Sequence, residues 1–179
     1  EYDIRVKVVD MDGGSSEWTI YLDNVTVRNN GPQFADYTFI DTEGTSNLSH
    51  AELHRSDTMS ILVNSNDIED TEADLVVSVE HRSSSGDWST EYLSNATYSQ
   101  EHQSWMFYFI PLPTSELGLY DIRINVSDFD GDSTGWQGFD EVITVLNNNP
   151  VLVNHSFNSS VLRTNTIILE LNASDIEDS

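Results

Sequence analysis

The sequence has no cysteine, a single lysine (Lys7) and no run of about 18 consecutive apolar residues. The absence of cysteine excludes a disulfide framework, so packing, ions or glycans must stabilise any small secreted domain here. Seven Lys and Arg against 31 Asp and Glu give a net charge of −24. This balance excludes nucleic acid as a partner, because phosphate binding depends on basic side chains. The lack of a long apolar run predicts no membrane span in this segment.

Helical periodicity is also absent, and apolar residues instead alternate with polar ones. Between residues 120 and 127, Tyr, Ile, Ile and Val occupy every second position, which is the pattern of a half-buried antiparallel strand. Further strands are predicted at 58–63, 75–81, 104–110 and 141–146. About seven short strands in ~100 residues predict an all-β chain of tandem immunoglobulin-like antiparallel β-sandwich domains.

The chain repeats itself at a spacing of 118 positions. Residues 2–32 and 120–150 align without a gap and share 15 of 31 residues. The segment 67–70 (Asp-Ile-Glu-Asp) returns at 175–178, a spacing of 108. A period this long indicates tandem domains, since solenoid repeats are roughly 20–50 residues long. We expect residues 30–149 to be a complete repeat, 1–29 the C-terminal strands of a preceding repeat, and 150–179 the N-terminal strands of a following one.

A glycine and a tyrosine precede the long alternating strand. Gly118 can supply a turn, and Tyr120 stands where the tyrosine corner of an immunoglobulin-like sandwich folds back to hydrogen-bond the preceding turn. With this assignment, 120–127 and 141–146 are the last two strands. The segments 58–63 and 74–81 become the second and third.

Two acidic loops follow from this assignment, one between the second and third strands and the other between the last two. Both emerge at the same end of such a sandwich, beside the linker from the preceding domain. The residues expected to converge there are Asp67, Glu69, Asp70, Asp128, Asp130, Asp132 and the linker residue Asn30. Calcium takes ~6–8 oxygen ligands of these types, so the sequence predicts calcium as a cofactor. The alternative is that the aspartates cap their own turns without any metal.

The chain contains seven Asn-x-Ser/Thr sequons. They lie at Asn24, Asn47, Asn95, Asn125, Asn154, Asn158 and Asn172. They predict a glycosylated protein that is extracellular or at the cell surface. The alternative is that a chain rich in Asn and Ser forms such triplets by chance.

The residues around the last two predicted strands resemble a known group. From Gly118 to Gly131 the chain reads Gly-x-Tyr-Asp-Ile-x-Ile-x-Val-x-Asp-x-Asp-Gly, and an Asn-Asn-Pro linker ends at Pro150. The pattern resembles the PKD-type and cadherin-like immunoglobulin-fold repeats of archaeal or bacterial surface proteins. The resemblance implies tandem modules of adhesins, surface layers or the stalks of exported enzymes. The chain departs from it at Gly86-Asp87-Trp88, which reorders the PKD Trp-Gly-Asp signature, and in a linker without the aspartates of cadherins.

No constellation typical of an enzyme is present. The five histidines are scattered, and the sequence has neither a Gly-x-Ser-x-Gly elbow nor a phosphate-binding glycine loop. We therefore expect a non-enzymatic structural repeat of an extracellular stalk, surface layer or filament. Its expected partners are neighbouring copies of the repeat, in the same or adjacent chains.

The aromatic residues leave one alternative function open. Apolar residues occupy every position from Trp105 to Ile110, so both faces of that predicted strand are apolar. Core and cross-strand packing is one explanation. The other is a platform for surface glycans, which would make the chain an adhesin or a carbohydrate-binding accessory module. Trp18 and Trp136 recur just after the acidic loops, and we expect them to pack over the loop or onto an adjacent domain.

Overall fold

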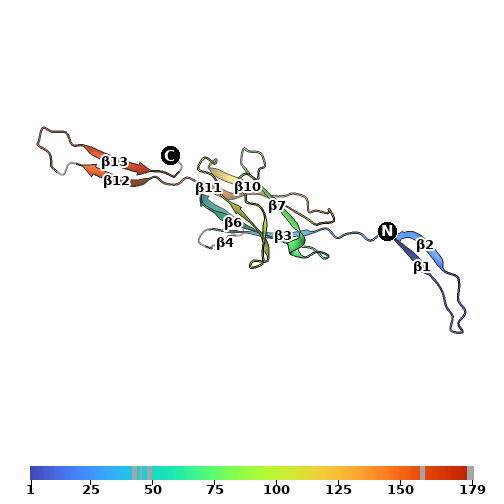
Figure 1. The fold of residues 1–179 in the computed structure, drawn as a ribbon. Helices are drawn as coiled ribbons and strands as arrows, with labels where there is room; N and C mark the ends of the chain where they lie inside the picture. The colour runs from blue at the N-terminus through green and yellow to red at the C-terminus, as the bar shows by residue number, and fades with distance from the viewer. Residues whose placement is uncertain (42–43, 45, 48–49, 158–159, 177–179) are drawn as a thin grey trace. The chain divides into compact units, whose positions relative to one another are not determined.

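The computed structural model of the protein describes residues 1–179 apart from 42–43, 45, 48–49, 158–159 and 177–179. The chain divides into two compact units, Glu1–Asn30 and Gly31–Ser179. Apart from one short 3-10 helix, η1 (Glu72–Asp74), the regular structure of the described residues consists of β-strands (Figure 1). The prediction of an all-β chain is therefore confirmed. Within the described ranges, no helix has the length and apolar character needed to cross a membrane.

Residues 31–149, here called the central part, form two sheets. One has the strand order β4-β3-β6-β9-β8 and the other β5-β11-β10-β7. Neighbouring strands are antiparallel, except that β5 runs parallel to β11. The strands are β3 (Gln33–Ile40), β4 (Ser46–Asn47), β5 (Ala51–His54), β6 (Met59–Asn66), β7 (Val76–Ser83), β8 (Thr97–Ser99), β9 (Ser104–Phe109), β10 (Gly118–Ser127) and β11 (Gln137–Leu146).

The five strands predicted from alternation are present, and the largest difference lies in β11. This strand begins at Gln137, whereas the alternating pattern indicated a start at residue 141. The register between β10 and β11 shifts between Tyr120 and Ile122, and Glu141 has a φ of 56°. Such a bulge reverses which residues face the core, so the alternation breaks there and hides the first half of the strand.

Apolar side chains from both sheets meet in one core. Alternate residues of β10 from Tyr120 to Val126 are buried, as are Met59, Ile61 and Val63 of β6. The rings of Tyr37 on β3 and Phe139 on β11 join the two sheets, with centroids 4.6 Å apart. Two sheets that share a core in this way are consistent with a β-sandwich.

Tyr120 ties β10 to the turn that precedes it. Its hydroxyl donates a hydrogen bond of 2.8 Å to the carbonyl of Glu116, which confirms the predicted contact with the preceding turn. Gly118 has a φ of 111°, a conformation that favours glycine. Burial is the main cause that raises the pKa of Tyr120 to about 12.

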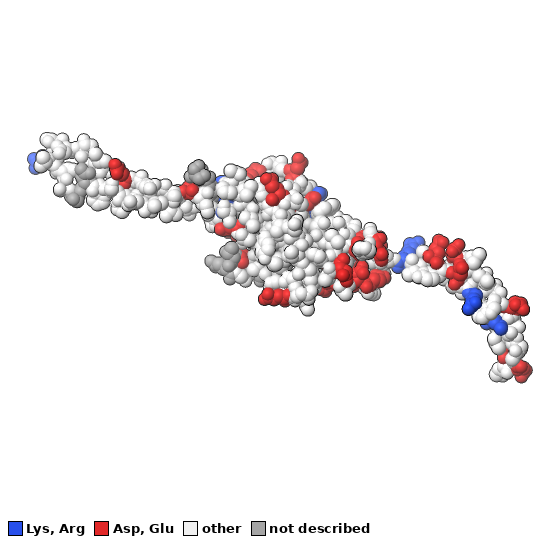
Figure 2. Space-filling model, viewed as in Figure 1, with Lys and Arg blue, Asp and Glu red and all other residues white. Residues whose placement is uncertain are grey.

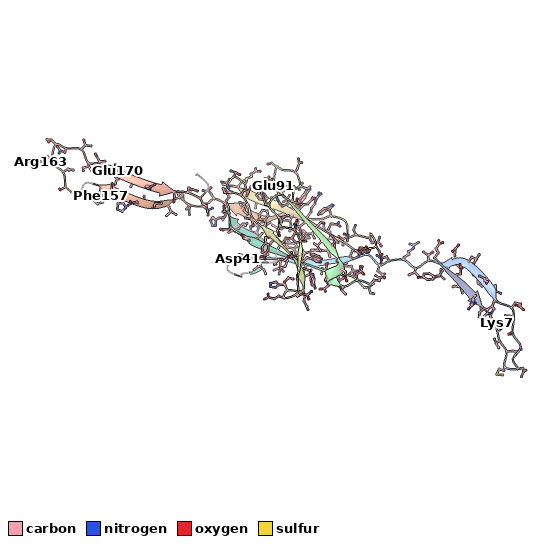
Figure 3. The ribbon with its side chains drawn as sticks, viewed as in Figure 1. Lys7, Asp41, Glu91, Phe157, Arg163 and Glu170 are labelled. Atoms are coloured by element: carbon pink, nitrogen blue, oxygen red, sulfur yellow. The ribbon has the colours of Figure 1, made fainter. Side chains whose placement is uncertain are left out.

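Two further hairpins are formed by residues outside the central part. The first unit contains β1 (Tyr2–Val6) and β2 (Thr19–Val25), and the C-terminal hairpin contains β12 (Val151–Phe157) and β13 (Leu169–Ser174). Phe157 and Glu170 mark the two strands of the C-terminal hairpin in Figure 3. All residues of these four strands are exposed, including their apolar ones.

The sequence repeat is also a repeat of strand register. Tyr2 pairs with Val25 as Tyr120 pairs with Ile143, each 118 positions further on, and in both hairpins the register shifts directly after the tyrosine. Asp23, the counterpart of Glu141, likewise has a positive φ, of 51°. Hairpin β1–β2 is therefore built like β10–β11 down to the position of its bulge.

The C-terminal hairpin repeats the pairing of β3 with β6. Leu152 pairs with Ala173 as Phe34 pairs with Ser65, at spacings of 118 and 108. In both pairs the next partner is two residues further along the first strand, so the irregularity recurs at the same position. The two different spacings found in the sequence thus correspond to the two strands of one hairpin.

Candidate functional site: an acidic loop pair

The loop after β10 is organised by a buried aspartate. Asp128 is buried, and its Oδ1 accepts hydrogen bonds from the backbone N–H groups of Gly131 (2.7 Å) and Asp132 (2.9 Å). Gly131 has a φ of 98°, which allows the tight turn. In the first unit, Asp10 Oδ1 accepts the matching bond from the backbone N–H of Gly14, the counterpart of Asp132, at 2.7 Å. Turn capping therefore accounts for one oxygen of this carboxylate.

The loop after β6 contains a second aspartate of this kind. Asp67 Oδ1 accepts hydrogen bonds from the backbone N–H groups of Glu69 (2.8 Å) and Asp70 (3.4 Å). The bond from Glu69 is the main cause that lowers the pKa of Asp67. The other oxygen, Oδ2, is shielded from solvent and has no hydrogen-bond partner in the described structure. A carboxylate oxygen placed in this way is costly unless a positive charge or a donor reaches it.

The two loops lie together at one end of the central part. The pKa of Asp70 is raised, first by burial and then by the charges of Asp67, Asp130, Asp128 and Asp74. Repulsion of this kind acts between loops only when they are close. Asp and Glu side chains gather at this end in the space-filling view (Figure 2).

A hollow of about 440 Å³ opens beside the loop after β6. Its lining includes Asp67, Asp70, Thr71, Glu72 and Tyr98. The Tyr98 hydroxyl donates a hydrogen bond of 3.0 Å to Glu72. The hollow is thus rich in oxygen atoms, which are the atoms that Ca²⁺ prefers.

The predicted ligands do not form a finished metal site. Within the ranges that the structure describes, no three His, Asp or Glu side chains are gathered in a way that could hold a metal ion. Glu69 and Asp130 are exposed. Asn30 belongs to the first unit, whereas both loops belong to the second. The chain enters the central part at Gly31, where an added Cβ would lie 3.6 Å from Cβ of Asp132.

The sequons fall in different surroundings. Asn24, Asn95, Asn154 and Asn172 are exposed, whereas Asn125 on β10 is half-buried and accepts a hydrogen bond of 3.4 Å from Thr134. Asn47 lies on β4, and Asn158 lies outside the described residues. By exposure, the four exposed asparagines are therefore better glycan acceptors than Asn125.

The aromatic residues of β9 divide between the two faces of the strand. Phe107 and Phe109 are in the core, and Tyr108 is 38% exposed. The half-buried ring of Trp105 meets Tyr98 edge-on, with an angle of 71° between the planes. Packing thus accounts for the alternate positions 107 and 109 of the predicted platform.

Sequence reasoning missed a stack of arginines and tryptophans on the second sheet. We call Arg82, Trp88, Arg123 and Trp136 the Arg–Trp stack. The Arg123 guanidinium lies over the rings of Trp88 (4.6 Å) and Trp136 (4.5 Å), and Arg82 lies 4.5 Å from the Trp88 ring. Such cation–π contacts fix both partners in place. Each arginine also pairs with a carboxylate, which neutralises its charge.

A signal for this stack was present in the repeat. Arg5 lies 4.8 Å from the ring of Trp18, and these residues are the counterparts of Arg123 and Trp136. Both pairs are among the identities shared by residues 2–32 and 120–150. The two tryptophans were expected to pack over their loops or onto a neighbouring domain. In each hairpin the tryptophan contacts an arginine of the adjacent strand, and Lys7 also lies 5.9 Å from the Trp18 ring.

A buried histidine was also missed. His81 on β7 is 3% exposed and stacks on Tyr92, with centroids 5.0 Å apart, while Phe109 and Tyr120 also contact its ring. Neither ring nitrogen has a hydrogen-bond partner in the described structure. Burial lowers the pKa of His81 to about 4. His81 is thus a neutral member of the core.

Neither a protein-family model nor a curated protein matches the sequence of the chain.

Proposed function

We propose that the chain is a run of immunoglobulin-like repeats that serves as a non-enzymatic structural segment of an extracellular stalk, surface layer or filament. The observation that carries this proposal is the recurrence of the same strand register, with the same irregularity, in β1–β2 and β10–β11 and again in β3–β6 and β12–β13. A catalytic site needs to occur only once, whereas a structural segment gains length from each copy.

The strand order of the central part supports the immunoglobulin-like assignment. In that fold, one sheet joins the first, second, fifth and fourth strands, and the other joins the third, sixth and seventh. β3, β6, β9 and β8 match the first set, and β7, β10 and β11 the second. The Tyr120 hydrogen bond stands where the tyrosine corner is expected. Hairpins β1–β2 and β12–β13, here called the outer hairpins, would then belong to further repeats of the same kind.

The exposed apolar side chains of the outer hairpins are consistent with that arrangement. Ile4 and Val6 in the first unit and Leu169 and Leu171 in the C-terminal hairpin are all at least 40% exposed. The equivalent positions of the central part contribute to a core. Under this proposal, neighbouring copies of the repeat supply the missing cover.

We further propose that the acidic loop pair binds calcium. Three observations support this: the mutual repulsion felt at Asp70, the buried and unpartnered Oδ2 of Asp67, and the adjacent oxygen-rich hollow. A divalent cation would remove the repulsion and supply the missing partner. Because the ligands are not yet gathered, binding would require side chains such as Asp130 to turn inward.

Calcium titration of the full chain tests the cofactor. With a Kd of about 0.1 mM, within the range of extracellular modules, 1 mM Ca²⁺ should stabilise the central part by roughly 1.4 kcal/mol. Asp70→Asn should lower this gain, while the exposed Asp140→Asn on β11 serves as the matched control and should keep it. A melting temperature that is the same in Ca²⁺ and in a chelator would exclude the calcium site.

Small-angle scattering of the same chain tests the structural role. A compact 179-residue globule has a radius of gyration of about 16 Å. A string of separate repeats should give a clearly larger value, and a value near 16 Å would contradict the proposal. This measurement is independent of calcium, so the two parts of the proposal can fail separately.

A further inference from the structure

The free edge of β7 presents unpaired backbone groups. β7 is the end strand of its sheet. His81 exchanges two backbone hydrogen bonds with Ser89 (2.9 and 2.8 Å) on the side away from β10. Because bonding directions alternate along a strand, Val77 and Val79 present their N–H and C=O groups on that same side. Among the described residues no strand continues the sheet there, and an open edge of this kind invites pairing with other chains.

A hollow of about 320 Å³ lies along this edge. Its size is within the ~300–1,000 Å³ of small-molecule sites. Its polar lining residues are Ser78, Glu80, Thr90, Ser94 and Asn95, and the aromatic rings of Phe107 and Trp136 also line it. An indole ring beside hydroxyl, amide and carboxylate groups suits a sugar, since one face of a pyranose ring is apolar and its hydroxyl groups donate and accept hydrogen bonds.

The Arg–Trp stack holds the indole ring in place. Trp136 is 44% exposed, and the guanidinium of Arg123 lies 4.5 Å from its ring. Glu80 accepts a hydrogen bond of 2.6 Å from Arg123 Nε, and Trp88 lies on the same guanidinium. A ring fixed in this way loses little conformational freedom when a ligand stacks on it.

One wall of the hollow carries a sequon. Asn95 is exposed, and with Ala96 and Thr97 it completes an Asn-x-Thr triplet. A sugar attached there would begin at the wall of the hollow, and attachment gives it an effective concentration in the millimolar range or above, as for short linkers. We propose that the first sugar residue of a glycan linked to Asn95 occupies this hollow, against Trp136, and covers the open edge of β7.

The inference rests on the proposed location outside the cell, where N-glycans are found. Attachment uses a lipid-phosphate-linked oligosaccharide donor and a transferase. The bond from sugar C1 to the phosphate oxygen breaks, the bond from C1 to Asn95 Nδ2 forms, and the lipid phosphate leaves as the amide proton is lost. The structure then assigns the sugar a defined place on the protein surface.

Thr97 provides a matched pair of variants, because its side chain is exposed and completes the sequon. Thr97→Ala removes the acceptor, whereas Thr97→Ser retains it. The full chain and both variants are secreted from a eukaryotic host that attaches N-glycans, and an endoglycosidase trims each glycan to one N-acetylglucosamine. In the wild-type and Thr97→Ser chains, hydrogen exchange of the peptide covering β7 should be slower than in Thr97→Ala, on the order of tenfold at Val77 and Val79.

Free N-acetylglucosamine then probes whether the hollow is filled. The Thr97→Ala chain should bind it with a shift of the Trp136 indole N–H resonance, and the glycosylated chain should not. Equal binding by both chains would show an empty hollow and overturn the inference. So would a glycosylated chain that dimerises through β7, because a second copy would then be the occupant.

Mass spectrometry separates this inference from the proposed function. If sugar is found on the exposed Asn24 but not on Asn95, the inference falls while the structural role stands. Trp18→Ala serves as a further control, because Trp18 has the same arginine contact in the first unit but does not line this hollow. It should leave both the exchange at β7 and the sugar binding unchanged.

Discussion

Hairpins β1–β2 and β10–β11 have the same local structure and opposite burial. Tyr2 is 60% exposed and its counterpart Tyr120 2%, although both occupy the same register position before the same bulge. The backbone N–H of residue 23 donates to the Asp3 carboxylate at 3.0 Å, as that of residue 141 donates to Asp121 at 2.8 Å. Turn, register and bulge therefore follow from local sequence, while burial depends on a second sheet.

The difference separates two kinds of stabilisation. In β10–β11, Ile122 and Ile124 are in contact with the core that both sheets share. In β1–β2, the hydrogen bonds and the Arg5–Trp18 contact are present without that core. Isolated hairpins are marginally stable in water, so substitutions should have unequal effects at equivalent positions.

The largest difference is expected for the buried isoleucine. Ile122→Ala should destabilise the central part by about 2–5 kcal/mol, because it leaves a cavity in the core. Ile4→Ala, 118 positions earlier and 40% exposed, should leave unfolding of the central part unchanged. Denaturant unfolding followed by circular dichroism measures both. An equal loss in the two variants would show that the face of β1–β2 is covered.

His81 should make the stability of the central part depend on pH. Its pKa is about 4 when folded against a usual 6.5, so the unfolded chain binds more protons between these values. Stability should therefore fall as the pH falls from about 6.5 to 4, by roughly 3 kcal/mol in total. His81→Phe should remove this dependence. His155→Phe, in the exposed hairpin β12–β13, should preserve the pH dependence. If His155→Phe removed it, the pH dependence would come from His155, and the prediction for His81 would be wrong.

The hydroxyl of Tyr120 should contribute less to the stability of the central part than Ile122 or His81 does. Tyr120→Phe leaves the Glu116 carbonyl without its partner and should cost about 1 kcal/mol. Tyr2→Phe is the matched change in the exposed hairpin and should cost nothing measurable in the same unfolding experiment. If Tyr120→Phe were also neutral, the turn before β10 would be held by other contacts.

The smallest effect should be the same in both hairpins. Asp23 and Glu141 have positive φ, which is unfavourable for residues with a side chain. Replacing either by glycine should stabilise its hairpin by a few tenths of a kcal/mol, because the relief of strain outweighs the added flexibility of the unfolded chain. Hairpin populations from NMR chemical shifts measure the change. A gain confined to Glu141→Gly would show that burial, not local conformation, controls the bulge.

Much of the fold could be predicted, because β-strand alternation and turn residues act locally. The strand 120–127, the turn at Gly118 and the hydrogen bond of Tyr120 all follow from adjacent residues. The first half of β11 was hidden, because the bulge at Glu141 interrupts the alternation on which the prediction depended.

The candidate site was less accessible to sequence reasoning. The proximity of the acidic loops followed from strand order, but the unpartnered oxygen of Asp67 depends on packing around a single atom. The Arg–Trp stack joins β7, β10 and the residue before β11. Such cross-strand contacts have no spacing rule in the sequence, although the recurrence of Arg5 and Trp18 at Arg123 and Trp136 was visible. Alternation along the predicted strand 75–81 places His81 on the same face as the buried Leu75, Val77 and Val79. The aromatic residues that enclose its ring come from three other segments, and the sequence does not show which ones they are.

Two hairpins that share the same strand register can take each other's place in a sheet. Neighbouring repeats that contain such hairpins can therefore misassemble by exchanging them. Hairpin β1–β2 has the shape to replace β10–β11, yet the aligned segments 2–32 and 120–150 that contain them differ at 16 of 31 positions. One of these is Phe139, whose ring contacts Phe34 and Tyr37 in the core. Its counterpart Tyr21 would bring a hydroxyl to that place. If the chain is the proposed run of repeats, the divergence of the copies would let each repeat recognise its own strands during folding.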